Sequence, residues 1–259
     1  MTSTLLSSIA PASVFIEKDY GLLCDIVASR MAALVQAKPE AVLGLATGST
    51  PLGVYERLAR RHKEEGLDFS RVTCFNLDEY YPMTSESPHS YHSFMQENLF
   101  RHINCRHWFV PKGHARDDAQ IAQDCRAYEA RIAAAGGLDL QLLGIGRSGH
   151  VGFNEPGSLP DSRTRLVTLH AQTREDAADS FGGIENVPHQ AVSMGIGTIL
   201  GAREIVMMAS GAGKADIVRA AWTGNVTTEV PASWVRTHPN TWLCLDKSAA
   251  SLLLEEDPD

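Results

Sequence analysis

Short apolar runs alternate with segments of helical periodicity along this chain, and the connections between them are short. The runs at 41–46 and 204–209 contain almost no polar residues, which is typical of strands that are buried on both faces. Between such runs, apolar residues recur at helical spacing, as they do in 18–36. This alternation predicts a doubly wound α/β fold, in which helices cover both faces of a mostly parallel sheet.

No low-complexity linker interrupts the pattern, so we expect a single domain over 1–259 with a Rossmann-like three-layer sandwich. Strands are expected at 41–46, 72–76, 108–110, 138–145, 166–170, 191–195, 204–209 and 241–245. Helices are expected at 18–36, 51–65, 90–102, 117–135, 172–181, 196–200, 215–222 and 231–235.

Charge and cysteine content limit the partners and the compartment. Lys+Arg 23 against Asp+Glu 31 gives a net charge of -8, which argues against nucleic-acid binding but allows a small anionic substrate in a locally positive site. No run reaches the roughly 20 apolar residues of a membrane span, and the N-terminus lacks the basic start of a signal peptide. The cysteines form no CxxC pair, which favours free thiols in a reducing cytoplasm: Cys24, Cys74, Cys105, Cys125 and Cys244.

Two turns between a strand and a helix have the composition of anion-binding sites. In the first, Thr47-Gly48-Ser49-Thr50 precedes Pro51, and we expect Thr50 to cap the helix that Pro51 begins. The second, Ser210-Gly211-Ala212-Gly213-Lys214, has the same design with a lysine added. Free N–H groups at such helix starts can bind a phosphate. The alternative is that both are ordinary turns that bind nothing.

Acid and base groups follow two further predicted strands. Asp78 and Glu79 come after the run 72–76, where the alternative is a solvated pair of loop carboxylates. The run 138–145 leads into a loop with Gly146, Ser148, Gly149, His150 and Glu155, and an imidazole beside a carboxylate suggests proton transfer. The histidines at 89, 92, 102 and 107 lack the spacing of a metal site, so no metal is expected.

The carboxyl ends of parallel strands meet at one edge of the sheet, so these four loops are expected to lie together. Two of them suit an anion and two carry acid or base groups, a combination that favours a sugar phosphate as substrate. No GxGxxG followed by a ribose-binding acid is present, and no GxSxG is present, which argues against a dinucleotide enzyme and an esterase.

The segments LGLATGSTP, FNLDEYY, GIGRSGHVGFNEPGS, SRTR and GKADIVRAA together resemble the glucosamine-6-phosphate deaminases, from about Ala41 to Asp246. The related 6-phosphogluconolactonases and the sugar-sensing domains of some transcription regulators share the fold but lack the pairing of NLDEY with GHxxFNEP. The resemblance implies isomerisation and deamination of glucosamine 6-phosphate to fructose 6-phosphate and ammonia. Such an enzyme is a deaminase and isomerase, classed as a hydrolase of an amino-sugar C–N bond.

The resemblance also implies roles for individual residues. Asp78 would move the C2 proton to C1, and His150 would open the sugar ring with help from Glu155 and Ser148. No metal or organic cofactor is needed, because the substrate amine supplies the electron shift. The substrate and its phosphate would be held by Thr47, Gly48, Ser49, Thr50, Glu79, Gly146, Gly149, Lys214 and Arg174.

The chain departs from the better-known bacterial enzymes at three places. Ser148, preceded by Arg147, stands where they have an acid, so His150 has one carboxylate partner instead of two. Asp179 stands at about the position of their phosphate-binding arginine, with Arg174 as a candidate replacement. Of the pair that binds the allosteric effector in regulated members, Arg165 matches but Val167 replaces the lysine, so we expect no such regulation.

Three alternatives stay open at this point. Relatives that act on galactosamine 6-phosphate also lack the loop acid, so that sugar is the second candidate substrate. A 6-phosphogluconolactonase would hydrolyse its substrate without releasing ammonia. A non-catalytic sugar-phosphate sensor would be expected to lack Asp78, His150 or Glu155, and all three are present. The sequence allows a homo-oligomer but does not indicate its size.

Overall fold

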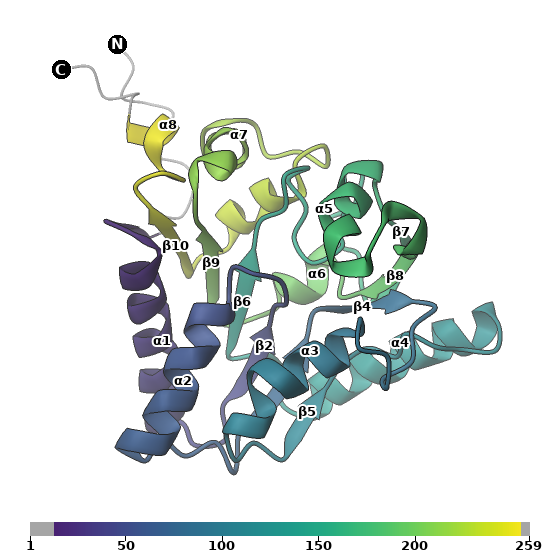
Figure 1. Ribbon diagram of the computed structural model, residues 1–259, viewed down its shortest axis with the longest axis horizontal. Helices are drawn as coiled ribbons and strands as arrows, with labels where there is room; N and C mark the ends of the chain where they lie inside the picture. Colours follow the sequence, from purple (N-terminus) through teal and green to yellow (C-terminus); the bar gives the residue numbers. More distant parts are fainter. Residues whose placement is uncertain (1–12, 255–259) are drawn as a thin grey trace.

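The computed structural model describes residues 13–254, and its centre is a seven-stranded sheet in the order β1-β10-β9-β6-β2-β3-β5 (Figure 1). Every neighbouring pair in this sheet is parallel. The strands are β1 (Ser13–Glu17), β2 (Val42–Leu45), β3 (Thr73–Asn76), β5 (His107–Phe109), β6 (Leu140–Gly144), β9 (Ile205–Ala209) and β10 (Thr241–Asp246). The doubly wound parallel sheet is therefore confirmed, and β1 is an additional edge strand that was not predicted.

Side chains alternate along the buried strands and form a hydrophobic core on each face of this sheet. Leu43 and Leu142 face one core, whereas Val42 and Leu143 face the other. The first core is covered by α1 (Tyr20–Ala37), α2 (Leu52–Glu65) and α3 (Tyr91–Asn98). The second is covered mainly by α4 (Asp118–Ala134), α6 (Ile196–Ile199), α7 (Ala215–Thr223), α8 (Ser251–Leu254) and the 3₁₀ helix η4 (Pro231–Thr237). This gives the expected three-layer sandwich.

Helix α1 is the one described helix that is long and apolar enough to cross a membrane by length and composition alone. It is a core helix of this fold, because Leu23, Val27, Met31 and Val35 are buried in the first core. Its Tyr20 hydroxyl also accepts a hydrogen bond from Gly53 N at 2.9 Å and donates to the Thr50 carbonyl at 3.0 Å.

The contact with Tyr20 explains why the predicted start of α2 is wrong. The helix begins at Leu52, Pro51 occupies the cap position, and no side chain caps it. The expectation that Thr50 caps a helix beginning at Pro51 is wrong, because the tyrosine from α1 satisfies the N–H of Gly53 instead.

The second correction concerns a separate three-stranded antiparallel sheet, formed by β4 (Asp78–Tyr81), β8 (Gln190–Ser193) and β7 (Arg165–Thr168). Two of these strands were predicted near their positions, but as members of the parallel sheet. The third was not predicted, because the polar sequence DEYY does not have the pattern of a buried strand. Between β7 and β8 lie α5 (Ala171–Phe181) and the 3₁₀ helix η2 (Ile184–Asn186).

Leu77 joins the two sheets. It is the single residue between β3 and β4, its N–H donates to the Leu45 carbonyl at 3.0 Å, and its carbonyl accepts from Met194 N at 2.7 Å. The chain thus passes from β3 of the large sheet directly into the small one, and it places Asp78 and Glu79 at the junction.

Candidate active site

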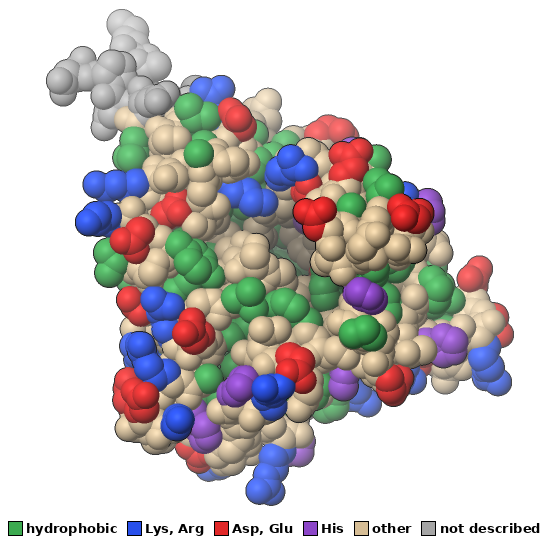
Figure 2. Space-filling model, viewed as in Figure 1, with side chains coloured by type: hydrophobic (Ala, Val, Ile, Leu, Met, Phe, Trp, Pro, Cys, Tyr) green, Lys and Arg blue, Asp and Glu red, His purple; other side chains and the backbone are tan. Residues whose placement is uncertain are grey.

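The site lies where the strand order of the large sheet reverses. The chain runs outward from β2 to β3 and β5, and then returns to the other side of β2 as β6. The loops after β2 and β6 therefore diverge, and they leave a crevice at the carboxyl ends of the two strands, the usual ligand site of an open α/β sheet. A cavity of about 570 Å³ occupies this place and is visible as a hollow near the middle of the face in Figure 2.

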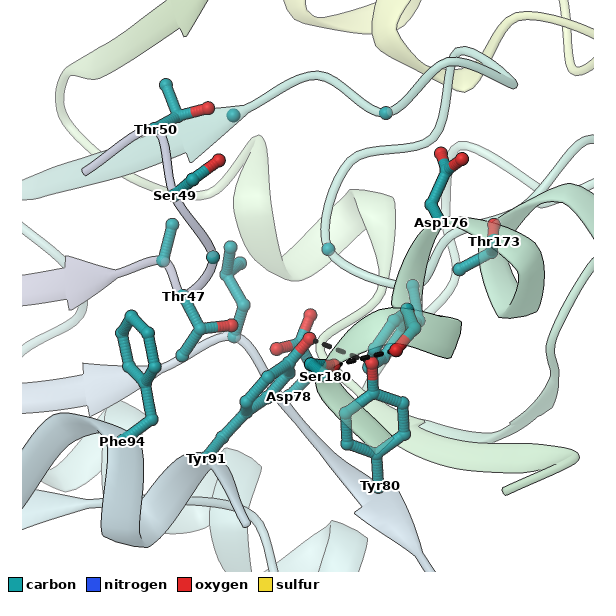
Figure 3. A pocket seen from close by; sticks show the side chains of 18 of the residues that line it. Thr47, Ser49, Thr50, Asp78, Tyr80, Tyr91, Phe94, Thr173, Asp176 and Ser180 are labelled. Atoms are coloured by element: carbon teal, nitrogen blue, oxygen red, sulfur yellow. Dashed lines mark hydrogen bonds between the residues drawn. The ribbon is translucent and has the colours of Figure 1, made fainter. Parts of the chain in front are cut away.

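The predicted phosphate-binding turn lines this cavity. Thr47, Gly48, Ser49 and Thr50 all border it, and the side chains of Thr47, Ser49 and Thr50 lie on one side of the cavity in Figure 3. Gly48 has a φ of +88°, a conformation that side chains rarely adopt, so a glycine lets the chain turn here.

Asp78 lies at the floor of the cavity. Its side chain is buried with only 4% of the residue exposed, and among residues 13–254 no group donates a hydrogen bond to its carboxylate. Burial raises the pKa of Asp78 well above its usual value, and the neighbouring charge of Glu79 raises it further. A carboxylate held in this way is a stronger base than an exposed one.

Glu79 points away from the cavity, because consecutive side chains of β4 face opposite sides. Its carboxylate accepts hydrogen bonds from the N–H groups of Tyr80, Tyr91 and His92 at 2.9, 2.9 and 3.0 Å. Burial raises the pKa of Glu79 to about 7, against the lowering effect of these three donors. The side chain predicted to bind substrate is thus placed at the start of α3 and is not among the residues that line the cavity.

His150 reaches the cavity from the glycine loop after β6. Its ring covers Gly146 so closely that any side chain at 146 would overlap the imidazole. Ser148 and Thr173 place their hydroxyl oxygens 2.8 and 3.2 Å from Nδ1 of His150. Gly146 is therefore a glycine because the ring needs its space.

Glu155 lies behind His150 and does not line the cavity. Its Oε2 is 3.4 Å from Nδ1 of His150 and accepts a hydrogen bond from Ser148 at 3.1 Å, while Oε1 accepts from His170 N at 3.1 Å. Burial alone would raise the pKa of Glu155, but His150, Thr173 and the N–H of His170 together lower it. Ser148 thus bridges the imidazole and the carboxylate.

Lys214 closes the cavity from the start of α7. Its Nζ donates to the Ile145 carbonyl at 2.8 Å. Burial lowers the pKa of Lys214, the charge of Asp176 opposes this, and Arg147 adds to it. Within residues 13–254, Lys214 is the one lysine or arginine that lines the cavity.

Two predicted residues lie elsewhere. The Arg174 guanidinium donates to the carbonyls of Ile184 and Val187, so it holds the turn after α5 instead of facing the cavity. Gly149 lies outside the cavity against Ile217 and Val230.

The structure therefore brings together the Thr47–Thr50 turn, Lys214, Asp78 and His150. Of the second predicted anion turn only Lys214 reaches the cavity, because Ser210 and the Gly211 N–H donate to the Asp246 carboxylate. Arg174 does not reach it either.

Sequence reasoning missed the contribution of α5 and α3 to the walls of the cavity. Helix α5 places Thr173, Asp176 and Ser180 along one wall of the cavity. Tyr91 and Phe94 of α3 form part of another. The helical spacing of 173, 176, 177 and 180 was available in the sequence, but only the pairing of β7 with β8 turns this face toward the cavity.

Within the described residues, no three His, Cys, Asp or Glu side chains are grouped as metal ligands. All five cysteines are buried and free.

Comparison with known proteins agrees with this geometry. A family profile described as glucosamine-6-phosphate isomerases/6-phosphogluconolactonase matches residues 21–243. The glucosamine-6-phosphate deaminase of Alkaliphilus metalliredigens is 46% identical over 242 residues, which cover 93% of this chain and 99% of the relative. Glucosamine-6-phosphate deaminase 1 of Bacillus subtilis is 45% identical over 236 residues, covering 90% and 96%.

Solved structures show the same fold. A structure described as a monomeric glucosamine-6-phosphate deaminase superimposes with a TM-score of 0.90 at 44% identity, covering 93% of this chain and 99% of that one. The 6-phosphogluconolactonase of Trypanosoma brucei has a TM-score of 0.76 at 20% identity, covering 95% and 100%, which indicates a shared fold alone. The chain belongs to the family of glucosamine-6-phosphate isomerases and 6-phosphogluconolactonases.

Proposed function

We propose that this chain is a glucosamine-6-phosphate deaminase, which forms fructose 6-phosphate and ammonia. The observation that carries the proposal is that Asp78 and His150 line one cavity together with Lys214 and the Thr47–Thr50 turn. A base, a proton-transfer group and an anion site around one cavity support a sugar phosphate as the substrate. Relatives with 45–46% identity that carry the name of this activity support the same substrate.

The first step is opening of the sugar ring by His150. Ser148 donates its one proton to Glu155, so its oxygen can only accept from Nδ1 of His150. The proton of the neutral imidazole then lies on Nδ1, and Nε2 is left to take the O1 proton and pass it to the ring oxygen. The lowered pKa of Glu155 keeps a negative charge behind the ring, which stabilises the imidazolium formed during this transfer.

The second step is proton transfer by Asp78. The carboxylate takes the proton from C2, the C2–H electron pair forms the C1–C2 double bond, and the C1=O π pair moves to O1, which takes a proton from the substrate ammonium group to give an enolamine. The same proton returns to C1, which leaves an imine at C2. Water then adds to C2 and ammonia leaves, so the net reaction consumes one water and breaks the C–N bond. In the net sense the reaction is a hydrolysis, although its chemistry is an isomerisation.

The assay that tests this proposal offers the purified protein glucosamine 6-phosphate, galactosamine 6-phosphate and 6-phosphogluconolactone. Ammonia and ketose phosphate are expected in equal amounts from glucosamine 6-phosphate. Ammonia release from galactosamine 6-phosphate alone would show that this sugar is the substrate. Hydrolysis of the lactone alone would show that the protein is a lactonase. No ammonia from either amino sugar would rule out a deaminase.

The same proposal includes a cytoplasmic enzyme that acts as one domain, in agreement with five free buried thiols. One solved relative is described as monomeric, which favours a site that is complete in one chain. All the residues that carry the mechanism above come from a single chain.

A further inference from the structure

The cavity has less positive charge than a sugar phosphate calls for. A phosphate monoester carries up to two negative charges at neutral pH, and Lys214 is the single lysine or arginine on the cavity wall among residues 13–254. Helix α5 moreover presents Asp176 to the same cavity. Acidic side chains lie on the α5 side of the hollow in Figure 2, and basic ones border it on the α7 side. A second cation is therefore needed close to Lys214.

Arg147 is in the right place to supply it. It follows Gly146, which lines the cavity, and its guanidinium forms an ion pair with Asp176 in which Nε is 3.1 Å from Oδ2. The charges of both partners act on the Lys214 ammonium, so the three groups form one electrostatic cluster. About half of the Arg147 side chain is exposed, which leaves it free to reorient.

We propose that Arg147 is the second cation of the phosphate subsite, and that Asp176 holds it there while the subsite is empty. An ion pair between partly exposed side chains is weak. A phosphate offers the guanidinium the same two-pronged geometry with more charge, so entry of the substrate transfers Arg147 from Asp176 to the phosphate. This inference rests on the proposed function for the identity of the substrate.

The rival interpretation is that the ion pair only clamps α5 to the glycine loop. The two interpretations predict opposite effects of Asp176→Asn on phosphate binding. If Asp176 competes with phosphate for Arg147, then Asp176→Asn frees the guanidinium and tightens phosphate binding. If the pair is a clamp, then Asp176→Asn and Arg147→Ala loosen the site in the same direction.

The experiment measures KM for glucosamine 6-phosphate and the inhibition constant of inorganic phosphate for the wild type, Arg147→Ala and Asp176→Asn. Arg147→Ala is expected to raise both constants by about tenfold or more, and Asp176→Asn to lower both by about two- to fivefold. The matched controls are Arg71→Ala and Glu40→Gln, which remove the same charges from an exposed ion pair at the amino ends of β2 and β3, and they should leave both constants unchanged.

A second readout is independent of turnover. Inorganic phosphate should raise the melting temperature of the wild type and of Asp176→Asn, and clearly less that of Arg147→Ala. Unchanged phosphate constants in Arg147→Ala, or weaker phosphate binding in both variants, would overturn the inference. A wild type that binds phosphate through Arg147 but releases no ammonia would overturn the proposed function alone.

Discussion

Two carboxylates belong to the same site, and their surroundings shift their pKa values in opposite directions. Asp78 is buried without a hydrogen-bond donor from the described residues, and burial raises its pKa. Glu155 is buried to a similar degree but accepts hydrogen bonds from Ser148 and His170 N, and its contacts with His150, Thr173 and His170 N lower its pKa. The difference assigns their roles, since the first is suited to taking a proton and the second to staying charged.

The comparison also explains why the two groups lie on different elements. Asp78 projects from β4, and no N–H group of residues 13–254 donates to its carboxylate, so no described group offsets its desolvation. Glu155 lies in a loop, where backbone and side-chain donors can converge. A base and a charge stabiliser thus need different local backbones as well as different partners.

The largest expected effect comes from Asp78→Asn, which removes the base and keeps the shape. Turnover should fall by about 10³-fold or more, since a positioned acid/base group contributes roughly 10²–10⁴ and here one group serves two transfers. The KM should change little, because the amide fills the same space. Steady-state ammonia release measures this, with Glu79→Gln as the neighbouring control that keeps the base. Turnover within tenfold of the wild type would show that Asp78 is not the base.

A smaller loss is expected for Glu155→Gln, about 10–10²-fold in turnover, because the imidazolium loses its charged partner. The variant should also lose about 1–3 kcal/mol of stability at neutral pH. Because the folded pKa of Glu155 is lowered, its contribution is present above the usual value of 4.5 and is lost as the pH falls through the folded pKa. Urea unfolding of the wild type and of Glu155→Gln should therefore show a difference in the free energy of unfolding at pH 7 that disappears below about pH 4.5. A difference that does not depend on pH would contradict the charged state of Glu155.

Ser148→Ala tests the bridge between these groups and should lower turnover by about tenfold. The alanine removes the oxygen that bridges Nδ1 of His150 and Glu155, so the imidazole loses the partner that fixes its tautomer. If Ser148 had a purely structural role, the pH dependence of turnover would stay the same in the variant. If Ser148 positions His150, the pH dependence of turnover should shift. Ser148→Thr, which keeps the hydroxyl, should restore most of the rate.

The smallest effects are on stability, and they differ in size at adjacent residues. Asp78→Asn should raise the melting temperature at pH 7 by about 2–6 °C, because a buried charge without donors costs stability once the pH exceeds its unfolded pKa. Glu79→Gln should change it less, because three N–H donors offset much of the burial of Glu79, although its pKa is still raised to about 7. Calorimetry of the two variants compares the two shifts, and a larger rise for Glu79→Gln than for Asp78→Asn would break the comparison.

The parallel sheet and its ligand-binding edge were predictable because runs such as 41–46 and 205–209 are apolar throughout and connect to helices. Asp78 and His150 were predictable for the same reason, as residues that follow such strands. The separation of Asp78 from Glu79 was not, because it requires a strand at 78–81 that pairs with 190–193, over a hundred residues away. The partners of Glu79 come from α3, and a local reading of the sequence cannot supply contacts of this kind.

The single residue between β3 and β4 also has a dynamic consequence. Because Leu77 is hydrogen-bonded to both sheets, the small sheet cannot separate without breaking bonds to β2 of the large one. The amide protons of Leu77 and Met194 should therefore exchange with solvent only through global unfolding, at matching rates. The floor of the cavity then belongs to the most slowly exchanging part of the molecule, and any opening that admits the substrate must occur in the walls above it.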